Sequence, residues 1–559
     1  MTLAVAVGAG AGAGSVIFRW CIKTFTHLLS GHADYAASPG ADNPHLPWLG
    51  PYFVLFAPVI GGLLYGPLVN RFAKEARGHG VPEVMLAVAQ RGGRISPKVA
   101  VVKTLASALC IGSGGSVGRE GPIVQIGSAL GSTLGRVTKV SEGRMKLLVA
   151  CGAAGGIAAT FNAPLAGVFF AMELILGTFS AEAFGATVLA SVTASIIGRT
   201  AFGNNAFLNL PDFHVGHLTQ YGLFALLGVG AAAVGVGFSR FLYMIEDACD
   251  WLWRGPEWLR PAVGGLALGV LLLTLPQMYG VGYPVLQKAT EGGYAVGFLL
   301  LLLVGKMLAT SLTIGVGGSG GVFAPSLFIG AMLGSAYGIG VHHLLPHSAG
   351  AVGAYALVGM GAVFAGAARA PITAVVILFE LTGEYSIILP LMLAIVLATA
   401  VSRLISRDTI YTLKLRRRGI DLDGPAPGAR IGTQHVDAVM ETLPSPMFAS
   451  TTLADAADLL SLSGHGALPV VDDTGRYVGV VTAQSVAEAL AEQPENAPTR
   501  VGQLAEAPAQ VTADQPLAQA MHALLSAAGT GVPVLDSERG KPVGWLSHQS
   551  ALRAVHTAS

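Results

Sequence analysis

The residues best suited to chemical function form two short motifs, Gly118-Arg119-Glu120-Gly121-Pro122 and Gly321-Val322-Phe323-Ala324-Pro325. In each motif, glycine and proline stand at the start of an apolar, helix-competent run, which is typical of a helix N-terminus. A helix N-terminus offers unpaired backbone N–H groups and about half a positive charge. Two such ends that meet inside the protein would bind an anion without a fixed cationic side chain, so that the ion can also leave.

Glu120 is the acidic residue within these motifs. Its carboxylate stands beside a site built for anions, so it can occupy that site itself and must leave before a free anion passes. Protonation would remove the negative charge that competes with the anion. The alternative interpretation is a glutamate that only complements the helix dipole.

The composition places these motifs in a membrane protein. Of 559 residues, 52 % are hydrophobic, 12 % are charged and 75 are glycines. So few charges cannot cover the surface of a soluble protein of this size, whereas glycine lets membrane helices pack closely. The net charge of +1 offers no basic excess for binding nucleic acid. The four cysteines lie in apolar segments and indicate neither a disulfide framework nor a metal site.

The apolar segments divide into full spans and interrupted ones. Three runs are expected spans or parts of spans: Met1–Val16, Leu223–Phe238 and Phe298–Leu312. Arg19 and Lys23 follow the first run as an interfacial anchor would. The runs Ile123–Leu134 and Pro371–Leu381 are too short to cross alone. Broken helices in a membrane are tolerated where they are buried in protein or line a polar cavity, which favours a transporter.

A long internal repeat surrounds the two motifs. Residues 111–135 align without gaps on residues 314–338, and 13 of the 25 positions are identical. Farther along, one proline-to-glutamate spacing occurs in both halves, as Pro164 with Glu173 and Pro371 with Glu380. Paired, interrupted segments in two halves of a membrane protein indicate a transport site at their interface. The repeat leaves open whether the halves are parallel or inverted.

The chain becomes more polar after residue 413. Residues 1–413 contain 17 acidic residues and residues 414–559 contain 15. We therefore expect a membrane domain at 1–413, a basic linker at 414–436 and a soluble domain at 437–559. The linker begins with Lys414-Leu415-Arg416-Arg417-Arg418, and basic residues beside a span stay in the cytoplasm. A strand–turn–strand pattern occurs twice in the tail, at residues 467–482 and 532–547.

The chain resembles the CLC family of chloride channels and chloride/proton antiporters that carry a C-terminal pair of CBS domains. The motifs around Glu120 and Phe323 are specific to this family, and the resemblance covers nearly all of the chain. It implies a multi-pass α-helical membrane fold of two inverted halves with broken helices, followed by cytosolic α/β CBS domains at about 437–494 and 500–559. It also implies a homodimer in the cell inner or plasma membrane, with one gated chloride pathway per subunit.

The resemblance also implies roles for single residues. Glu120 is the expected external gate, Val322 and Phe323 are backbone ligands, and the phenol of Tyr411 hydrogen-bonds the central anion from the inner side. The other residues of the expected anion site are Gly80, Val81, Pro82, Gly118, Arg119, Gly121, Pro122, Gly321, Ala324 and Pro325. No cofactor is required. Neither a nucleophile nor a metal cluster accompanies the glutamates, which argues against an intramembrane enzyme.

His79 is the first departure from the family pattern. The motif that usually reads G-S-G-I-P is Gly78-His79-Gly80-Val81-Pro82 here. His79 therefore replaces the serine whose hydroxyl contacts the central anion. A neutral imidazole still donates one N–H, and a protonated one adds charge. A purely structural histidine is the alternative.

Leu174 is the second departure. Antiporters of this family usually carry an inner glutamate one residue beyond the position of Glu173, and this chain has Leu174 there. Glu173 itself resembles a structural glutamate paired by symmetry with Glu380. An apolar side chain cannot relay a proton, so we expect channel-like anion transport. The alternative is an antiporter with a non-standard proton path.

The CBS pair resembles modules that bind adenine nucleotides. The usual ribose-binding aspartate is replaced by Ser485 after Thr482 and by Ser550 after Ser547. Hydroxyls bind a ribose diol less strongly than a carboxylate does. A nucleotide site at these four residues and a purely structural CBS pair are both compatible with the sequence. A protein that serves chiefly as a cytosolic ligand sensor is less favoured, because the tail's sites are weak.

Overall fold

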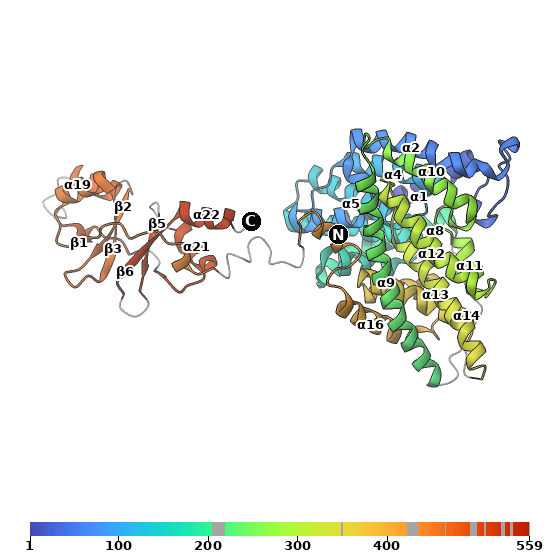
Figure 1. Ribbon diagram of the computed structural model, residues 1–559. Helices are drawn as coiled ribbons and strands as arrows, with labels where there is room; N and C mark the ends of the chain where they lie inside the picture. Colours follow the sequence, from blue (N-terminus) through green and yellow to red (C-terminus); the bar gives the residue numbers. More distant parts are fainter. Residues whose placement is uncertain are drawn as a thin grey trace. The chain divides into compact units, whose positions relative to one another are not determined.

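The computed structural model describes residues 1–203, 218–347, 350–421, 434–463, 466–491, 500–507, 510–526, 531–536 and 540–557. The chain forms two compact units, Met1–Asp421 and Leu422–Ser559 (Figure 1). The first unit is a bundle of helices, and the second consists of two small sheets with helices (Figure 1). The expected linker at 414–436 starts inside the first unit, and residues 422–433 lie outside the described residues.

The helical unit, called the membrane unit below, contains two successive sets of helices. The first set is α1 (Thr2–Ser30), α2 (Phe53–Phe72), α3 (Val81–Gln90), α4 (Pro97–Gly112), α5 (Glu120–Val137), α6 (Glu142–Phe161), α7 (Pro164–Phe170) and α8 (Ala181–Phe202). The second set is α9 (Leu218–Leu252), α10 (Arg260–Thr274), α11 (Tyr283–Thr290), α12 (Val296–Gly315), α13 (Phe323–Leu344), α14 (Val352–Ala368), α15 (Pro371–Thr382) and α16 (Ile388–Ile405). The short helix α17 (Thr412–Arg416) follows, and a π-helical turn, η4 (Ala171–Leu176), extends α7.

Eight helices of the described residues are long and apolar enough to cross a membrane. The expected spans Leu223–Phe238 and Phe298–Leu312 lie in α9 and α12. The two runs predicted to be too short, Ile123–Leu134 and Pro371–Leu381, lie in α5 and α15, and neither helix is among these eight. The first span differs from the expectation. Helix α1 continues to Ser30, so Arg19 and Lys23 lie inside it and line a cavity instead of anchoring its end. The two charged residues are accommodated within α1 because the second half of this helix forms one wall of that cavity.

The two sets of helices pack in matching pairs. Helix α5 packs on α6 as α13 packs on α14, and α1 packs on α8 as α9 packs on α16. The sequence repeat is therefore a structural repeat, and it extends beyond the aligned segment. The two sets meet where Gly118 pairs with Gly321 in an antiparallel bridge, the geometry expected around a two-fold axis.

Helix α9 defines the two faces of the membrane unit. Near its N-terminus, the Leu223 carbonyl accepts a hydrogen bond from Tyr337, in the C-terminal half of α13 (3.0 Å). Near its C-terminus, Glu246 forms an ion pair with Lys414 of α17. With 35 residues, α9 is about 50 Å long, enough to cross a bilayer. The C-terminal half of α13 therefore lies toward the face opposite α17.

Helix α5 ends on the same face as α17. Its Arg136 donates a hydrogen bond to the carbonyl of Ile95, in the loop after α3 (3.0 Å). Ile95 and Glu83 line one small cavity, and Glu83 pairs with Arg418, directly after α17. Equivalent helices α5 and α13 thus run toward opposite faces, which makes the two halves inverted, as the family resemblance implies.

The second unit, called the CBS tail below, is built from two similar halves. The first half contains β1 (Met447–Phe448), α19 (Leu453–Ser463), β2 (Ala467–Val471), β3 (Tyr477–Thr482) and α20 (Ala483–Ala491). The second contains β4 (Val511–Thr512), α21 (Leu517–Leu525), β5 (Gly531–Leu535), β6 (Pro542–Ser547) and α22 (His548–Thr557). In each sheet the middle strand pairs parallel with the first and antiparallel with the third, which confirms the predicted strand–turn–strand units.

Local contacts close each half and join the two. In the turn after β2, the Thr474 hydroxyl and nearby backbone N–H groups donate to Asp472, and these hydrogen bonds lower the pKa of its carboxyl. Glu441 bridges Trp545, and Val480 bridges Glu506 at the equivalent place in the other half. The buried Trp545 packs with Ala467 and Val480 between the two halves.

Candidate anion-binding site

The N-termini of α5 and α13 meet in the interior of the membrane unit. The Gly118 N–H donates to the Gly321 carbonyl (2.7 Å), and the Gly321 N–H donates to the Gly118 carbonyl (2.6 Å). Helix α5 begins two residues later, at Glu120, and α13 begins at Phe323. Both starts are buried, so their first N–H groups point into the protein rather than into water.

The N-terminus of α3 reaches the same place. Gly78 bridges Ser319, in the loop that leads to α13. Gly80 has a φ of +86°, a left-handed conformation that favours glycine and turns the chain into α3. A Cβ atom on Gly121 would lie 2.0 Å from the His79 carbonyl oxygen, so only glycine permits this approach of α3 to α5. Three helix N-termini therefore converge.

The structure brings the expected residues of the three motifs together in the interior. All are buried: His79, Gly80, Val81, Pro82, Gly118, Arg119, Glu120, Gly121, Pro122, Gly321, Val322, Phe323, Ala324 and Pro325. Arg119 is the one cation among them, and its guanidinium lies over the rings of Tyr283 and Phe161, at 5.1 and 5.8 Å from their centroids. The positive potential at the convergence therefore comes mainly from backbone N–H groups.

The carboxylate of Glu120 lies across this convergence. Its Oε1 accepts a hydrogen bond from the Tyr283 hydroxyl (2.7 Å), and its Oε2 accepts a longer one from the Ala324 N–H of α13 (3.4 Å). The side chain is 1 % exposed. A negative group thus stands at the N-terminus of α13, where an anion would bind.

His79 faces the interior without a protein partner. The residue is 3 % exposed, and neither Nδ1 nor Nε2 makes a hydrogen bond to any residue that the structure describes. Its ring lies 6.1 Å from the ring of Tyr243, centroid to centroid. A buried polar group without a partner is costly, so an imidazole N–H beside helix N-termini indicates a ligand that accepts a hydrogen bond.

Tyr411 lies at the inner end of this region. It is 1 % exposed and immediately precedes α17, which contacts α3. Its neighbour Ile410 is held on both sides, because its N–H donates to Ala367 (2.9 Å) and its carbonyl accepts from Tyr243 (2.5 Å). The backbone at Tyr411 is therefore fixed from two helices, α14 and α9.

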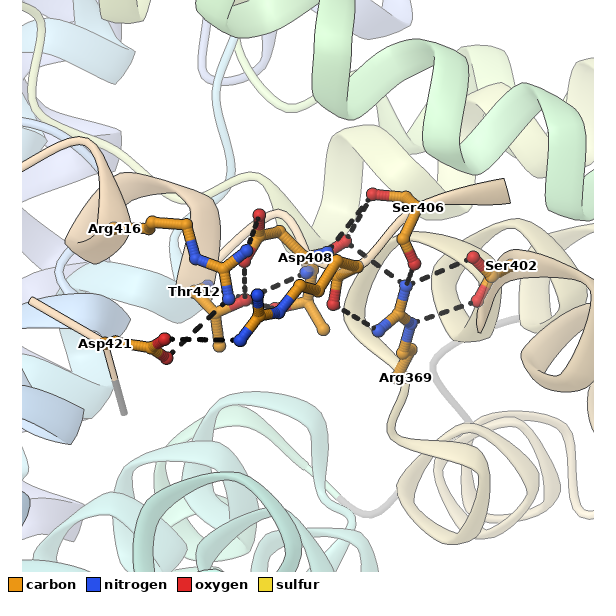
Figure 2. Close-up of polar contacts among 9 residues, drawn as sticks. Arg369, Ser402, Ser406, Asp408, Thr412, Arg416 and Asp421 are labelled. Atoms are coloured by element: carbon orange, nitrogen blue, oxygen red, sulfur yellow. Dashed lines mark hydrogen bonds and ion pairs between the residues drawn. The ribbon is translucent and has the colours of Figure 1, made fainter. Parts of the chain in front are cut away.

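Arg369 organises the turn between α16 and α17 (Figure 2). Its guanidinium donates to the Ser402 and Arg407 carbonyls (3.1 and 2.8 Å) and to the Ser406 carbonyl at the end of α16. The adjacent Asp408 pairs with Arg416 of α17 (2.8 Å). One arginine thus satisfies the free carbonyls at the C-terminus of α16 and fixes the start of α17.

Two fully buried lysines support the turns at the site. Lys103 of α4 donates to the carbonyls of Ala76 and Gly78 (2.9 and 2.8 Å), just before α3. Lys306 of α12 donates to Gly280 and Val281 (both 3.0 Å), just before α11, which Tyr283 begins. The lysines are 203 residues apart, the offset of the sequence repeat. They are equivalent residues in the two halves and hold equivalent turns.

A cavity of about 430 Å³ reaches Tyr283 from the face opposite α17. Arg19, Lys23 and Arg119 line it together with Asp34. The surplus of cations favours entry of an anion on this side. The cavity ends beside the hydroxyl that holds Glu120.

The glutamates on the inner side are bound to helix ends. Glu173 accepts hydrogen bonds from the N–H groups of Ile372 and Thr373 (3.2 and 2.8 Å), at the start of α15. Glu380 of α15 accepts from Leu165 and Ala166 (3.0 and 2.7 Å), at the start of α7. Leu174, in the π-helical turn, is 9 % exposed and belongs to the hydrophobic core.

The four hydroxyls of the candidate nucleotide site bond within the tail. Ser485 Oγ lies 3.1 Å from Thr482 Oγ1 and donates to the Thr482 carbonyl (2.9 Å), at the start of α20. Ser550 donates to the Ser547 carbonyl in the same way at the start of α22 (3.1 Å). Thr482 and Ser547 cap these helices, because Thr482 Oγ1 accepts from the Ser485 N–H (3.1 Å) and Ser547 Oγ accepts from the Ser550 N–H (3.0 Å).

Comparison with known proteins gives the chain a family. A family model described as voltage gated chloride channel matches residues 61–403, and one described as CBS domain matches residues 438–492 and 501–557. The chain belongs to the voltage-gated chloride channel family. The predicted resemblance to CLC proteins with a C-terminal CBS pair is confirmed.

Relatives and solved structures agree with this membership. A putative chloride channel protein, ClcB-like, from Ralstonia nicotianae is 37 % identical over 413 residues, which are 73 % of this chain and 94 % of the relative. The H(+)/Cl(-) exchange transporter ClcA of Vibrio cholerae is 36 % identical over 381 residues, 66 % of this chain and 80 % of the relative. The structure of a slow cyanobacterial Cl-/H+ antiporter matches with a TM-score of 0.67 and 28 % identity, covering 76 % of this chain and 98 % of its own. A eukaryotic CLC transporter shares the fold over 98 % of this chain and 97 % of its own, with a TM-score of 0.65 and 21 % identity.

Sequence reasoning missed Tyr283, Arg369 and the two lysines. One signal was available, because Gly280-Val281-Gly282-Tyr283-Pro284 repeats the glycine and proline spacing of the motif that contains His79. In this CLC-family chain that spacing marks the start of α11 as the counterpart of α3. The hydrogen bond from Tyr283 to Glu120 is a tertiary contact that spacing alone does not predict.

We expect Tyr283→Phe to strengthen chloride binding. The substitution removes the shorter of the two hydrogen bonds that hold Glu120 at the N-terminus of α13, so a free anion competes more easily. Hydrogen bonds to charged groups contribute about 1.5–3 kcal/mol, which predicts a roughly tenfold or larger gain in affinity by calorimetry at pH 7. Tyr279→Phe is the matched control, because that buried phenol donates to the Gly112 carbonyl instead. Equal chloride affinities in both variants would contradict the assignment.

We expect the chloride affinity to depend on a hydrogen-bond donor at residue 79. His79→Ser retains a donor, so its affinity should stay within a fewfold of wild type. His79→Leu removes the donor and should bind chloride roughly tenfold more weakly, the value of about one hydrogen bond to an ion. Calorimetric titration of the three proteins measures this. Wild-type affinity in the leucine variant would show that His79 is structural.

Proposed function

We propose that the protein moves chloride, or a similar small inorganic anion, across a membrane through one gated pathway in each subunit. The convergence of the N-termini of α3, α5 and α13 carries this proposal. It supplies backbone N–H donors in a buried place and keeps cationic side chains out of direct contact with the ion. Chloride is the anion named in both curated relatives, and the cation-lined cavity supplies an entrance.

In this proposal Glu120 is the gate, and Val322, Phe323, His79 and Tyr411 line the pathway. The Glu120 carboxylate closes the pathway by occupying the N-terminus of α13, and protonation frees it to leave. Its hydrogen bonds from Tyr283 and Ala324 support this role. They hold the charged form where an anion would bind.

Glu120→Gln should abolish gating by pH. A neutral amide does not mimic an anion at a helix N-terminus, so chloride flux from proteoliposomes should become nearly constant over roughly pH 4.5–7.5, where carboxylates complete their titration. Wild-type flux should fall as pH rises. Glu75→Gln removes an exposed carboxylate of the same unit and should keep the wild-type profile. A pH-dependent flux in Glu120→Gln would exclude this residue as the gate.

We propose that transport is channel-like, because Leu174 stands at the inner proton position. A proton that crosses the membrane needs acceptors or a water chain, and a buried leucine supplies no exchangeable proton. The nearby Glu173 and Glu380 accept hydrogen bonds from helix ends, which removes them as free acceptors.

The second candidate is a chloride/proton antiporter with a non-standard proton path. Relatives named as H(+)/Cl(-) exchange transporters favour it. The unpartnered ring nitrogens of His79 offer one exchangeable site along the anion path itself.

An imposed chloride gradient distinguishes the two candidates. We expect the wild-type protein in liposomes to drive little or no uphill proton movement, as reported by a pH dye inside the vesicles. Leu174→Glu adds the missing carboxylate, and the matched Leu174→Gln adds a polar group that does not ionise. Strong proton pumping by wild type at a fixed chloride-to-proton ratio would overturn the channel-like proposal and support the antiporter.

We further propose that the protein is a homodimer in the cell inner or plasma membrane, with the CBS tail in the cytoplasm. The basic run at α17 lies on one face of the membrane unit and leads to the tail, which supports this orientation. For the tail we favour a structural role over nucleotide binding. The hydroxyls of Thr482 and Ser547 already cap helices, and those of Ser485 and Ser550 accept hydrogen bonds from the N–H groups of these two cap residues.

A further inference from the structure

A basic groove lies on the face of the membrane unit that carries α17. Its volume is about 590 Å³. It is formed by the loop between α3 and α4 with Arg94 and Ser96, by the end of α5 with Arg136, and by the turn before α6 with Lys139. The floor is apolar, with Val140 and Met145. All of its charged lining residues are cations.

These cations have no acidic partner among the described residues. Arg94, Arg136 and Lys139 are exposed, and none takes part in an ion pair there. By contrast, the basic residues of α17 are paired with Glu246 and Asp408. Glu142, at the start of α6, pairs with Lys146 (2.8 Å) and also interacts electrostatically with Arg94, so the groove keeps a net positive charge.

The groove holds its cations in place. One nitrogen of Arg136 donates to the Ile95 carbonyl (3.0 Å), which fixes the guanidinium across the groove. Lys139 has a φ of +51°, an uncommon left-handed conformation for a side chain with a Cβ. The backbone conformation of this turn is therefore determined by the packing around it, because lysine itself does not favour a positive φ.

The groove lies at one end of the membrane unit, where we expect lipid headgroups. Helix α5 starts at the buried anion site, and the groove surrounds its opposite end at a face of the membrane unit. Val137 beside Arg136 is 75 % exposed, and Val101 on α4 is 63 % exposed. An apolar edge next to two arginines and a lysine matches an acyl chain next to a phosphate.

We propose that this groove binds the headgroup of an anionic phospholipid, with Arg94, Arg136 and Lys139 around its phosphate. The apolar edge favours a lipid over a free phosphate-containing solute. The binding site is separate from the anion pathway, so the proposal stands independently of the proposed function.

Lipid binding to the full-length protein tests the proposal. In native mass spectrometry we expect dioleoyl phosphatidylglycerol to bind in preference to dioleoyl phosphatidylcholine. Arg136→Gln/Lys139→Gln should weaken phosphatidylglycerol binding about thirtyfold, since each cation near an anionic surface contributes about a fivefold factor. The matched control Arg71→Gln/Arg254→Gln removes two exposed cations outside the groove and should leave binding within twofold of wild type.

Two outcomes would overturn the proposal. The first is equal phosphatidylglycerol affinity in the groove variant and in wild type. The second is displacement of the lipid from wild type by millimolar inorganic phosphate, which would assign the groove to a soluble anion. Wild-type chloride flux of the groove variant in pure phosphatidylcholine vesicles shows that this variant folds.

Discussion

The contact between Gly118 and Gly321 is the constraint on which the membrane unit depends. Their two backbone hydrogen bonds bring the first turns of α5 and α13 together in the interior. Each helix therefore starts where water does not reach, with N–H groups that need a partner. An anion, or the Glu120 carboxylate in its place, meets that need. Neither helix can start at the membrane surface and still supply this site, which explains why the repeat consists of broken helices.

The backbone carbonyl groups of the loops around a buried anion site also need hydrogen-bond partners. The turns before α3 and α11 expose carbonyl groups to an apolar interior, where an unpaired polar group costs about 1–3 kcal/mol. Lys103 and Lys306 donate hydrogen bonds to these carbonyls, so the carbonyls are not left unpaired in the interior. The proposed pathway requires such an arrangement, which attracts an anion for entry and still allows it to leave.

The sequence predicts where helices start better than it predicts contacts between distant residues. Glycine and proline spacing predicted the starts of α5 and α13, because those residues determine where a helix begins. The partner of Glu120 was missed, because a hydrogen bond from Tyr283 joins residues 163 apart. The continuation of α1 past Val16 was missed because Arg19 is accommodated by a cavity, which hydropathy does not reveal. The serine at 485 was assigned to a ribose on family grounds, whereas its spacing from Thr482 is also that of a helix cap.

Glu173 and Glu380 are structural carboxylates, a role that differs from that of a proton carrier. Helices α7 and α15 start inside the protein, and each takes its capping carboxylate from the other, through Glu380 and Glu173. This exchange ties the two inverted halves together and depends on both carboxylates staying in place. A proton carrier must instead accept, move and release a proton. Residue 174 follows directly after the cap at Glu173, on a π-helical turn that adds one residue to the helical repeat. Its identity can therefore change without loss of the cap. In the proposed function, the fold would hold a glutamate at this position as it holds Leu174, and a change in proton coupling would leave the proposed anion site intact.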